Sequence, residues 1–183
     1  MPPTVYTVGH GNRSIDELTS VLASVGVGRL IDVRRFPGSR RHPHFARESL
    51  ERWLPDRGVG YEWRGEELGG RRNPSPGPSR HAAWRSSSFQ AYADHMDTED
   101  FRRALEGLIA EARAGPALAV MCAETLWWKC HRRLISDSLV ARGITVIHLV
   151  DENNRQPHRF HPSARVENGG VVYDVGVDRE LDL

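Results

Sequence analysis

The chain has 183 residues, of which 39% are hydrophobic and 27% are charged, and its formal net charge is +1. This length and composition are typical of a globular domain with a sizeable core, and they exclude a chain that is disordered by composition. No apolar stretch approaches the roughly 20 residues that a membrane-spanning helix needs, and the N-terminus lacks the pattern of a secretory signal, so we expect a cytoplasmic protein that does not enter a membrane.

The first half of the chain alternates short apolar runs with amphipathic helical patterns. We expect strands at residues 4–9, 30–33 and 61–64, and helices at residues 14–26 and 46–54. Ser14 and Glu17 have the spacing of a capping box that opens the first helix, and Gly26 closes it. Pro55 is expected to stop the second helix. Residues 69–88 hold prolines, serines and arginines without periodicity, which predicts a long loop and a candidate lid.

The second half continues the same alternation. We expect a helix from Asp97 or Thr98 to Gly115, strands at residues 117–121 and 144–150, and a helix at residues 130–142. The short apolar run at residues 171–173 predicts a further edge strand.

Short apolar runs without alternation, separated by amphipathic helices, are typical of a parallel sheet that is covered on both faces. We therefore expect an α/β fold, a three-layer sandwich with a mostly parallel, Rossmann-like central sheet and helices on both faces. Residues 1–150 are expected to form a single domain with a Pro- and Arg-rich loop at 71–88. Residues 151–183 are expected to be a C-terminal extension that packs on this domain or frays from it.

Ionisable and nucleophilic side chains stand where the predicted strands end. They are His10, Asp32, Arg34, Cys122, Glu124, His148 and Asp151. A single polar residue at a strand end usually has only a structural role. Four strand ends that all carry such residues indicate a site, because ligands bind beyond the carboxyl ends of parallel strands. The prediction places six residues around one pocket: His10, Asp32, Arg34, Cys122, Glu124 and His131.

The segment from Cys122 to Arg133 carries the clearest chemical signal. If a helix begins at Cys130, three cations lie in or beside its first turn, where the helix dipole disfavours positive charge. They are Lys129, Arg132 and Arg133. A bound anion would remove this conflict, and phosphate is the natural candidate. The same position favours the thiolate of Cys130. The alternative is that the cationic side chains point into solvent.

Three known cysteine chemistries fit this segment incompletely. A cysteine phosphatase loop needs an arginine at a fixed distance after its cysteine, and that position is Trp128 here. A rhodanese-type loop needs glycines, which are missing between Cys122 and Arg133. A zinc deaminase matches Cys122-Ala-Glu124, with Glu124 as proton shuttle, but it also needs a Pro-Cys-x-x-Cys motif that this chain lacks.

The two cysteines leave a metal site open as a further hypothesis. The candidate ligands for zinc or iron are Cys122, Cys130 and His131, completed by His10 or His148. The spacing of the cysteines differs from that of structural zinc sites. The sequence therefore identifies no cofactor.

Basic residues gather in residues 29–85, which hold 13 arginines and seven acidic residues, a local balance of +6. Within residues 32–45, arginines alternate with aromatic residues and prolines. In a nucleic-acid-binding loop of this kind, Arg34 and Arg41 would bind phosphates and the aromatic rings would stack on bases. The alternative is a solvated loop in which Asp32 pairs internally with an arginine.

Several short motifs together resemble a known family. They are Thr7-Val-Gly-His10, Asp32-Val-Arg34 with Pro37 and Ser39-Arg40, Leu68-Gly69-Gly70, residues 90–96, Cys122-Ala-Glu124 and Cys130-His131-Arg132. In this order, between residues 4 and 148, they resemble the bacterial domain-of-unknown-function family 488 (DUF488). The resemblance implies a compact cytoplasmic α/β domain and implies no activity. The loop at 71–88 departs from the family pattern.

These observations favour an enzyme, a hydrolase or a transferase, that acts on a phosphate-bearing small molecule such as a nucleotide, or on nucleic acid. The candidate catalytic residues are Cys122, Glu124, Cys130, His131 and His10, and the candidate substrate-binding residues are Asp32, Arg34, Arg41, Arg132 and Arg133. Glu124 would act as general acid or base, and one cysteine as nucleophile or metal ligand. Two alternatives remain, a non-catalytic nucleic-acid-binding module built on residues 29–85 and a thiol or metal protein.

Overall fold

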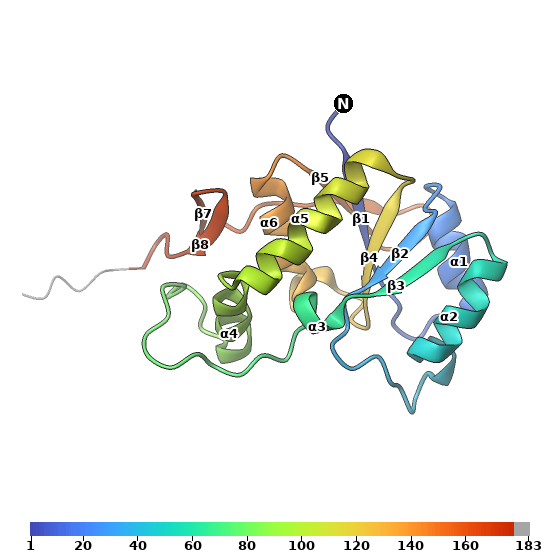
Figure 1. The fold of residues 1–183 in the computed structure, drawn as a ribbon, viewed down its shortest axis with the longest axis horizontal. Coiled ribbons are helices and arrows are strands. Elements are labelled where there is room, and N and C mark those ends of the chain that lie inside the picture. The colour runs from blue at the N-terminus through green and yellow to red at the C-terminus, as the bar shows by residue number, and fades with distance from the viewer. Residues whose placement is uncertain (178–183) are drawn as a thin grey trace, which may run out of the picture.

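A six-stranded sheet forms the centre of the computed structural model, which describes residues 1–177 (Figure 1). Along the sheet the strands follow the order β3-β2-β4-β1-β5-β6. Their bounds are β1 Thr4–Gly9, β2 Arg29–Asp32, β3 Gly60–Trp63, β4 Leu118–Cys122, β5 Thr145–Leu149 and β6 Arg155–Pro157. The strands β1 to β5 run parallel, and the edge strand β6 runs antiparallel to β5.

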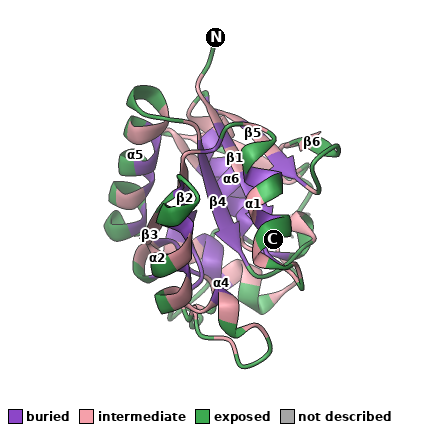
Figure 2. Ribbon diagram, turned by 90° about the vertical axis from the view of Figure 1, so that its right-hand side faces the viewer, coloured by how far each residue is buried: buried purple, intermediate pink, exposed green. Residues whose placement is uncertain are grey.

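Helices cover both faces of this sheet. Their bounds are α1 Ile15–Ala23, α2 Arg47–Asp56, α3 Gly65–Leu68, α4 Ser87–Met96, α5 Glu99–Ala114 and α6 Arg132–Ala141, with 3-10 turns at Pro43–Phe45 and Trp127–Lys129. The helices α1 and α2 bury Leu18 and Leu50 against one face, whereas α4, α5 and α6 bury Tyr92, Phe101 and Leu134 against the other. Figure 2 shows the buried residues concentrated between these layers. The predicted three-layer α/β sandwich is confirmed. Within residues 1–177, no helix combines the length and apolarity needed to cross a membrane.

The central position of β4 in the sheet explains why its sequence is continuously apolar. Leu118, Val120 and Cys122 belong to the core under α5 and α6, and the residues between them belong to the core under α1 and α2. Every residue of β4 is buried, so neither face accepts a polar side chain. At its carboxyl end Cys122 lies opposite Gly9 of β1. The ends of β1 and β4 therefore deliver their polar residues to the same edge of the sheet.

The sequence signals predict where the helices begin more accurately than where they end. Ser14 accepts a hydrogen bond from the backbone N–H of Glu17 at 3.1 Å, and the Glu17 carboxylate accepts the backbone N–H of Ser14 at 3.2 Å, which confirms the predicted capping box. The prediction that Pro55 stops the second helix is wrong, because α2 ends two residues later than predicted, at Asp56. Pro55 lies inside the last turn of α2, which the N–H of Arg57 closes by donating to the carbonyl of Leu54 at 2.9 Å.

The C-terminal segment was expected to add an edge strand to the central sheet at residues 171–173, and this is wrong. The strand β8 (Gly170–Tyr173) pairs antiparallel with β7 (Ala164–Glu167) in a separate two-stranded sheet. This hairpin packs on α6, and Tyr173 is buried in the core. The edge position next to β5 is taken by β6, whose short polar sequence carries no strand pattern.

Candidate functional site

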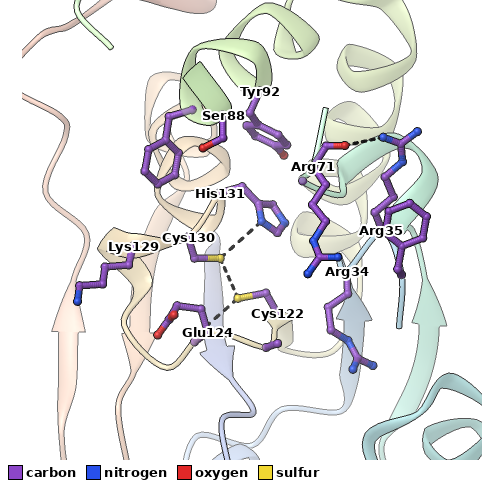
Figure 3. Close-up of a pocket in the computed structure, with 14 residues that line it drawn as sticks. Arg34, Arg35, Arg71, Ser88, Tyr92, Cys122, Glu124, Lys129, Cys130 and His131 are labelled. Carbon is purple, nitrogen blue, oxygen red and sulfur yellow. Dashed lines mark hydrogen bonds between the residues drawn. The ribbon is translucent and has the colours of Figure 1, made fainter. Parts of the chain in front are cut away.

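A cavity of about 470 Å³ opens beyond the carboxyl ends of β2 and β4 (Figure 3). The end of β4 and the turn into α6 line one side, the residues after β2 and the Gly70-Arg71 turn line another, and α4 contributes side chains above them. Five residues predicted from the sequence line it together: Arg34, Cys122, Glu124, Cys130 and His131.

Two thiols lie in contact at this cavity. Cys122 ends β4, and Cys130 lies just before α6. Their Sγ atoms are 2.8 Å apart, and both are free cysteines with exposed fractions of 2% and 7%. Residues that are eight positions apart in the chain are thus neighbours in space, a question that their spacing alone left open.

One sulfur of this pair is stabilised as a thiolate. Burial and the neighbouring Cys130 raise the pKa of Cys122 well above its usual range, so Cys122 keeps its proton and donates it. Burial also raises the pKa of Cys130, but the hydrogen bond from Cys122 and the charge of Arg132 outweigh it and bring the pKa to about 7. The backbone N–H of Arg132, in the first turn of α6, lies 3.4 Å from the Cys130 Sγ. Cys130 is therefore the sulfur of the pair that ionises more readily.

Arg132 lies beneath the two thiols and is only 1% exposed. Its Nε donates to the Cys122 Sγ at 2.9 Å, and its terminal nitrogens donate to Thr7 Oγ1 at 3.1 Å and to the carbonyls of Glu124 and Thr125. Among the described residues it forms no salt bridge with a carboxylate. Burial lowers the pKa of Arg132, but its interactions with the two cysteines outweigh burial and raise the pKa above its usual value. The guanidinium of Arg132, which the sequence predicts to bind substrate, faces the two sulfurs.

His131 and Glu124 bring two further functional groups to the cavity. His131 Nε2 donates to the carbonyl of Val33 at 3.0 Å, which leaves Nδ1 as an acceptor 3.6 Å from the Cys130 Sγ. Burial lowers the pKa of His131, so its ring is neutral near pH 7. Gly70 packs against this ring, where an added Cβ would lie 3.0 Å from Nδ1. The Glu124 side chain is exposed at the cavity and accepts a backbone N–H of the following turn.

Arg34 is held in place from behind the cavity wall. Its Nε and Nη2 donate to the two carboxylate oxygens of Asp32 at 2.9 and 2.7 Å, and Tyr61 donates its hydroxyl to the same carboxylate at 2.6 Å. His10 donates from Nδ1 to the Gly11 carbonyl, so its Nε2 accepts from Arg34 at 3.3 Å. Burial lowers the pKa of His10 to about 4. Asp32 and His10 therefore orient Arg34 and do not line the cavity themselves.

Of the cations at the cavity mouth, Lys129 was singled out from the sequence and Arg71 was not. Arg71 has a left-handed backbone (φ 57°), its guanidinium points toward the cavity, and it has no side-chain hydrogen bond or ion pair within residues 1–177 (Figure 3). Lys129 also lines the cavity. Arg41, by contrast, is exposed outside the cavity, and Arg133 lies over the Trp84 ring at 5.8 Å.

A buried chain of hydrogen bonds leads away from the thiols on the far side of Arg132. Arg132 donates to Thr7 Oγ1, which lies 2.6 Å from His148 Nδ1. His148 Nε2 lies 3.0 Å from His158 Nδ1, and His158 Nε2 lies 2.8 Å from the carboxylate of Asp137. Burial lowers the pKa of His148 to about 2, so this ring is neutral. Sequence analysis named His148 at a strand end but found none of its partners.

The helix α4 is the element over the cavity that sequence analysis missed. Ser86 caps it by accepting the N–H of Phe89 at 3.4 Å, and Phe89, Tyr92 and Met96 follow helical spacing. Tyr92 donates its hydroxyl to the carbonyl of Leu68 at 2.7 Å, and its ring centre lies 5.2 Å from that of His131. The cap and the apolar spacing are a sequence signal that identifies this helix at the end of the predicted loop.

The residues proposed as metal ligands are engaged with other groups. Cys122, Cys130 and His131 are neighbours, but the ring nitrogens of His10 and His148 make their hydrogen bonds elsewhere. In the part of the chain that the structure describes, no group of three or more His, Cys, Asp or Glu side chains is arranged to hold a metal ion.

Comparison with known proteins gives one match. A family model described as "Domain of unknown function DUF488" matches residues 14–139, which is more than half of the chain and includes every residue that lines the cavity. No curated protein and no solved structure matches the chain.

Proposed function

Since the chain belongs to the DUF488 family, whose description gives no activity, we propose from its site that it is a thiol-dependent enzyme in which Cys130 attacks a phosphate-bearing substrate, a nucleotide or a nucleic acid. The observation that carries this proposal is the buried guanidinium of Arg132 against the cysteine pair. A buried charge without an opposite charge is strongly destabilising. With no carboxylate salt bridge to Arg132 in the described chain, the Cys130 thiolate is the anion that balances it.

The cavity suits an anionic ligand of nucleotide size. Its volume of about 470 Å³ lies in the range of small-molecule sites. Arg71 and Lys129 bring positive charge to it, and the Phe36 ring at its edge is 62% exposed, which allows it to stack on a base. An arginine fork and an ammonium are the side chains that bind phosphate most often.

The proposed reaction begins when the Cys130 thiolate forms a bond to an electrophilic atom of the substrate, while the bond to the leaving group breaks and the leaving group keeps its electron pair. Glu124, exposed at the same cavity, supplies the proton to the leaving group and then removes a proton from the water or acceptor that displaces Cys130. Cys122 stabilises the thiolate by its S–H donation and does not react in this sequence.

The experiment is turnover with a panel of nucleotides and short single-stranded oligonucleotides, followed by mass spectrometry of substrate, product and the Cys130 peptide. We expect the wild-type protein to consume a member of the panel, Cys130→Ser to abolish turnover, and Cys122→Ser to retain it. Arg71→Gln is expected to raise the KM, whereas Arg113→Gln, which removes an exposed arginine on α5, leaves it unchanged. Wild-type turnover by Cys130→Ser, or equal KM values for the two arginine variants, would contradict the proposal.

A further inference from the structure

The proposed reaction does not require a contact between two sulfurs. A thiolate nucleophile needs a hydrogen-bond donor, and that donor need not be a second cysteine. At 2.8 Å, Cys122 Sγ is the nearest reactive neighbour of Cys130 Sγ, and the cavity gives the pair a route to solvent. Once Cys130 is part of a mixed disulfide, its Sγ would lie within direct reach of Cys122. Such a pair, one sulfur ionised and the other close behind it, has the parts of a dithiol exchange site.

We propose that the Cys122–Cys130 pair performs thiol–disulfide exchange with a small, negatively charged disulfide that enters this cavity. Cys130 is the attacking sulfur, since it is the more exposed of the two and lies beside the N-terminus of α6. Cys122 is the resolving sulfur, since it is buried behind Cys130 and keeps its proton.

The step balances in atoms and electrons. The Cys130 thiolate attacks one sulfur of the disulfide R–S–S–R, so a Cys130–S–R bond forms and one R–S⁻ leaves. Cys122 then loses its proton to solvent and attacks the Cys130 sulfur, so the Cys122–Cys130 bond forms and the second R–S⁻ leaves. The two cysteines are oxidised, and the substrate disulfide is reduced by two electrons to two R–S⁻ groups. Because Cys130 reacts as the thiolate, the protein gives up one proton, that of Cys122, and the released R–S⁻ groups take up protons from solvent.

The charge of the cavity selects the substrate class. Within the described chain its wall carries the cations Arg35, Arg71 and Lys129, besides Arg34, whose charge Asp32 balances. Glu124 is the one acidic residue among the described residues that line it. A disulfide flanked by carboxylates is therefore favoured over a neutral one of similar size, and added salt reduces the preference.

Arg132 also sets the direction of the equilibrium. In the reduced protein its buried charge is balanced by the thiolate, whereas the disulfide has no charge and leaves the guanidinium without a counter-ion. The reduced state is therefore the stabilised one, so the disulfide is easily reduced and the pair is oxidising. The hydrogen bond from Cys122 and the charge of Arg132 both stabilise the Cys130 thiolate, so both favour the reduced state.

The test uses the full chain and oxidised glutathione as the probe, with acid quenching and mass spectrometry of the cysteine peptides. We expect the wild-type protein to form the Cys122–Cys130 disulfide and to release two glutathione thiols. Cys122→Ser should stop at a stable glutathione adduct on Cys130, and Cys130→Ser should leave Cys122 unmodified. A persistent adduct on the wild-type protein, or modification of Cys122 in Cys130→Ser, would overturn the proposal.

Two comparisons test the substrate class and the equilibrium. Oxidised glutathione should react faster than the neutral hydroxyethyl disulfide, and the ratio of the two rates should fall toward one in Arg71→Gln and remain in Arg113→Gln. Arg132→Gln, if circular dichroism shows it folded, should shift the glutathione equilibrium toward the protein disulfide, and an unshifted equilibrium would contradict the role of Arg132. Equal rates for the two probes would exclude the anionic class. Cys122→Ser blocks only exchange, so this inference and the proposed function are tested separately. Exchange without turnover would contradict the proposed function alone, and turnover without exchange would contradict this inference alone.

Discussion

A matched pair of substitutions at Cys122 isolates the hydrogen bond that ionises Cys130. Lowering the Cys130 pKa from 9.0 to about 7 corresponds to about 3 kcal/mol in favour of the thiolate. A hydrogen bond to a charged group contributes roughly 1.5–3 kcal/mol, so the Cys122 donor accounts for about half or more of the effect. Cys122→Ala removes the donor and should raise the Cys130 pKa by about one to two units. Cys122→Ser keeps an O–H donor and should leave it near 7.

The assay is the rate of alkylation of Cys130 by iodoacetamide between pH 5 and 10, read from the Cys130 peptide by mass spectrometry. The thiolate alone reacts, so the midpoint of the rate profile reports the pKa. At pH 7 the wild-type thiol should be about half ionised, whereas an unperturbed thiol with a pKa of 9.0 would be about 1% ionised. The Ala variant should therefore react several-fold to tens of times more slowly than the Ser variant at pH 7.

Two results would refute this reasoning. A wild-type midpoint near 9 would show that burial outweighs the hydrogen bonds and the charge of Arg132. Identical midpoints for Cys122→Ala and Cys122→Ser would show that the contact between residues 122 and 130 does not stabilise the thiolate. Circular dichroism of both variants serves as the folding control, since serine and alanine each fit the space of the buried cysteine.

Three further predictions concern the residues behind the cavity. The pKa of His10 is about 4 in the folded protein and 6.5 in the unfolded chain, so only the unfolded chain takes up a proton between these values. His10 should therefore contribute a fall of up to about 3 kcal/mol in the free energy of unfolding, measured by urea titration, as the pH drops from 6.5 to 4, and the total fall should be smaller by this amount in a His10→Asn protein. Asp32→Asn leaves the buried guanidinium of Arg34 without its carboxylate and should lower the free energy of unfolding by about 3–5 kcal/mol in the same titration. Tyr61→Phe removes one hydrogen bond to that carboxylate and should lower it by about 1 kcal/mol. Equal losses in the two variants would contradict the ion-pair argument. Gly9→Ala should destabilise the fold and slow Cys130-dependent reactions together, because the added Cβ would overlap the backbone of the turn that follows β4, and an unaltered protein would show that this turn can move.

The sequence predicts the sheet and the edge that carries the cavity, because strands that are buried on both faces have apolar residues at every position. The strand β4 is apolar at every position, and the first polar residues after it are the ones that line the cavity. The prediction that Arg34, Cys122, Glu124 and His131 meet at one edge needs only parallel strands of similar length. Asp32 and His10 arrive at the same edge, and burial then turns them into supports for Arg34.

The direction of each side chain around α6 lies beyond what the sequence pattern can give. His131, Arg132 and Arg133 are consecutive, and each step along a helix turns the side chain by about 100°. His131 therefore faces the cavity, Arg132 points under the thiols, and Arg133 lies over the Trp84 ring. A rule that counts cations at a helix N-terminus treats the three alike, so it does not predict that the Arg132 guanidinium is buried against the cysteine sulfurs.

The charge of Arg132 also explains why segments outside the matched range of residues 14–139 take part in the site. Its Nη1 donates to Thr7, and if the Thr7 hydroxyl donates onward, the neutral ring of His148 has its N–H free for His158, which in turn donates to the buried carboxylate of Asp137. Every N–H and O–H in this chain then points from the guanidinium toward the carboxylate, so each group is polarised in the same sense. The chain fixes Arg132 on the side away from the sulfurs. Its Nε is thereby aimed at the thiol pair, and the strand β5 and the segment after β6 become part of the electrostatic support of the Cys130 thiolate.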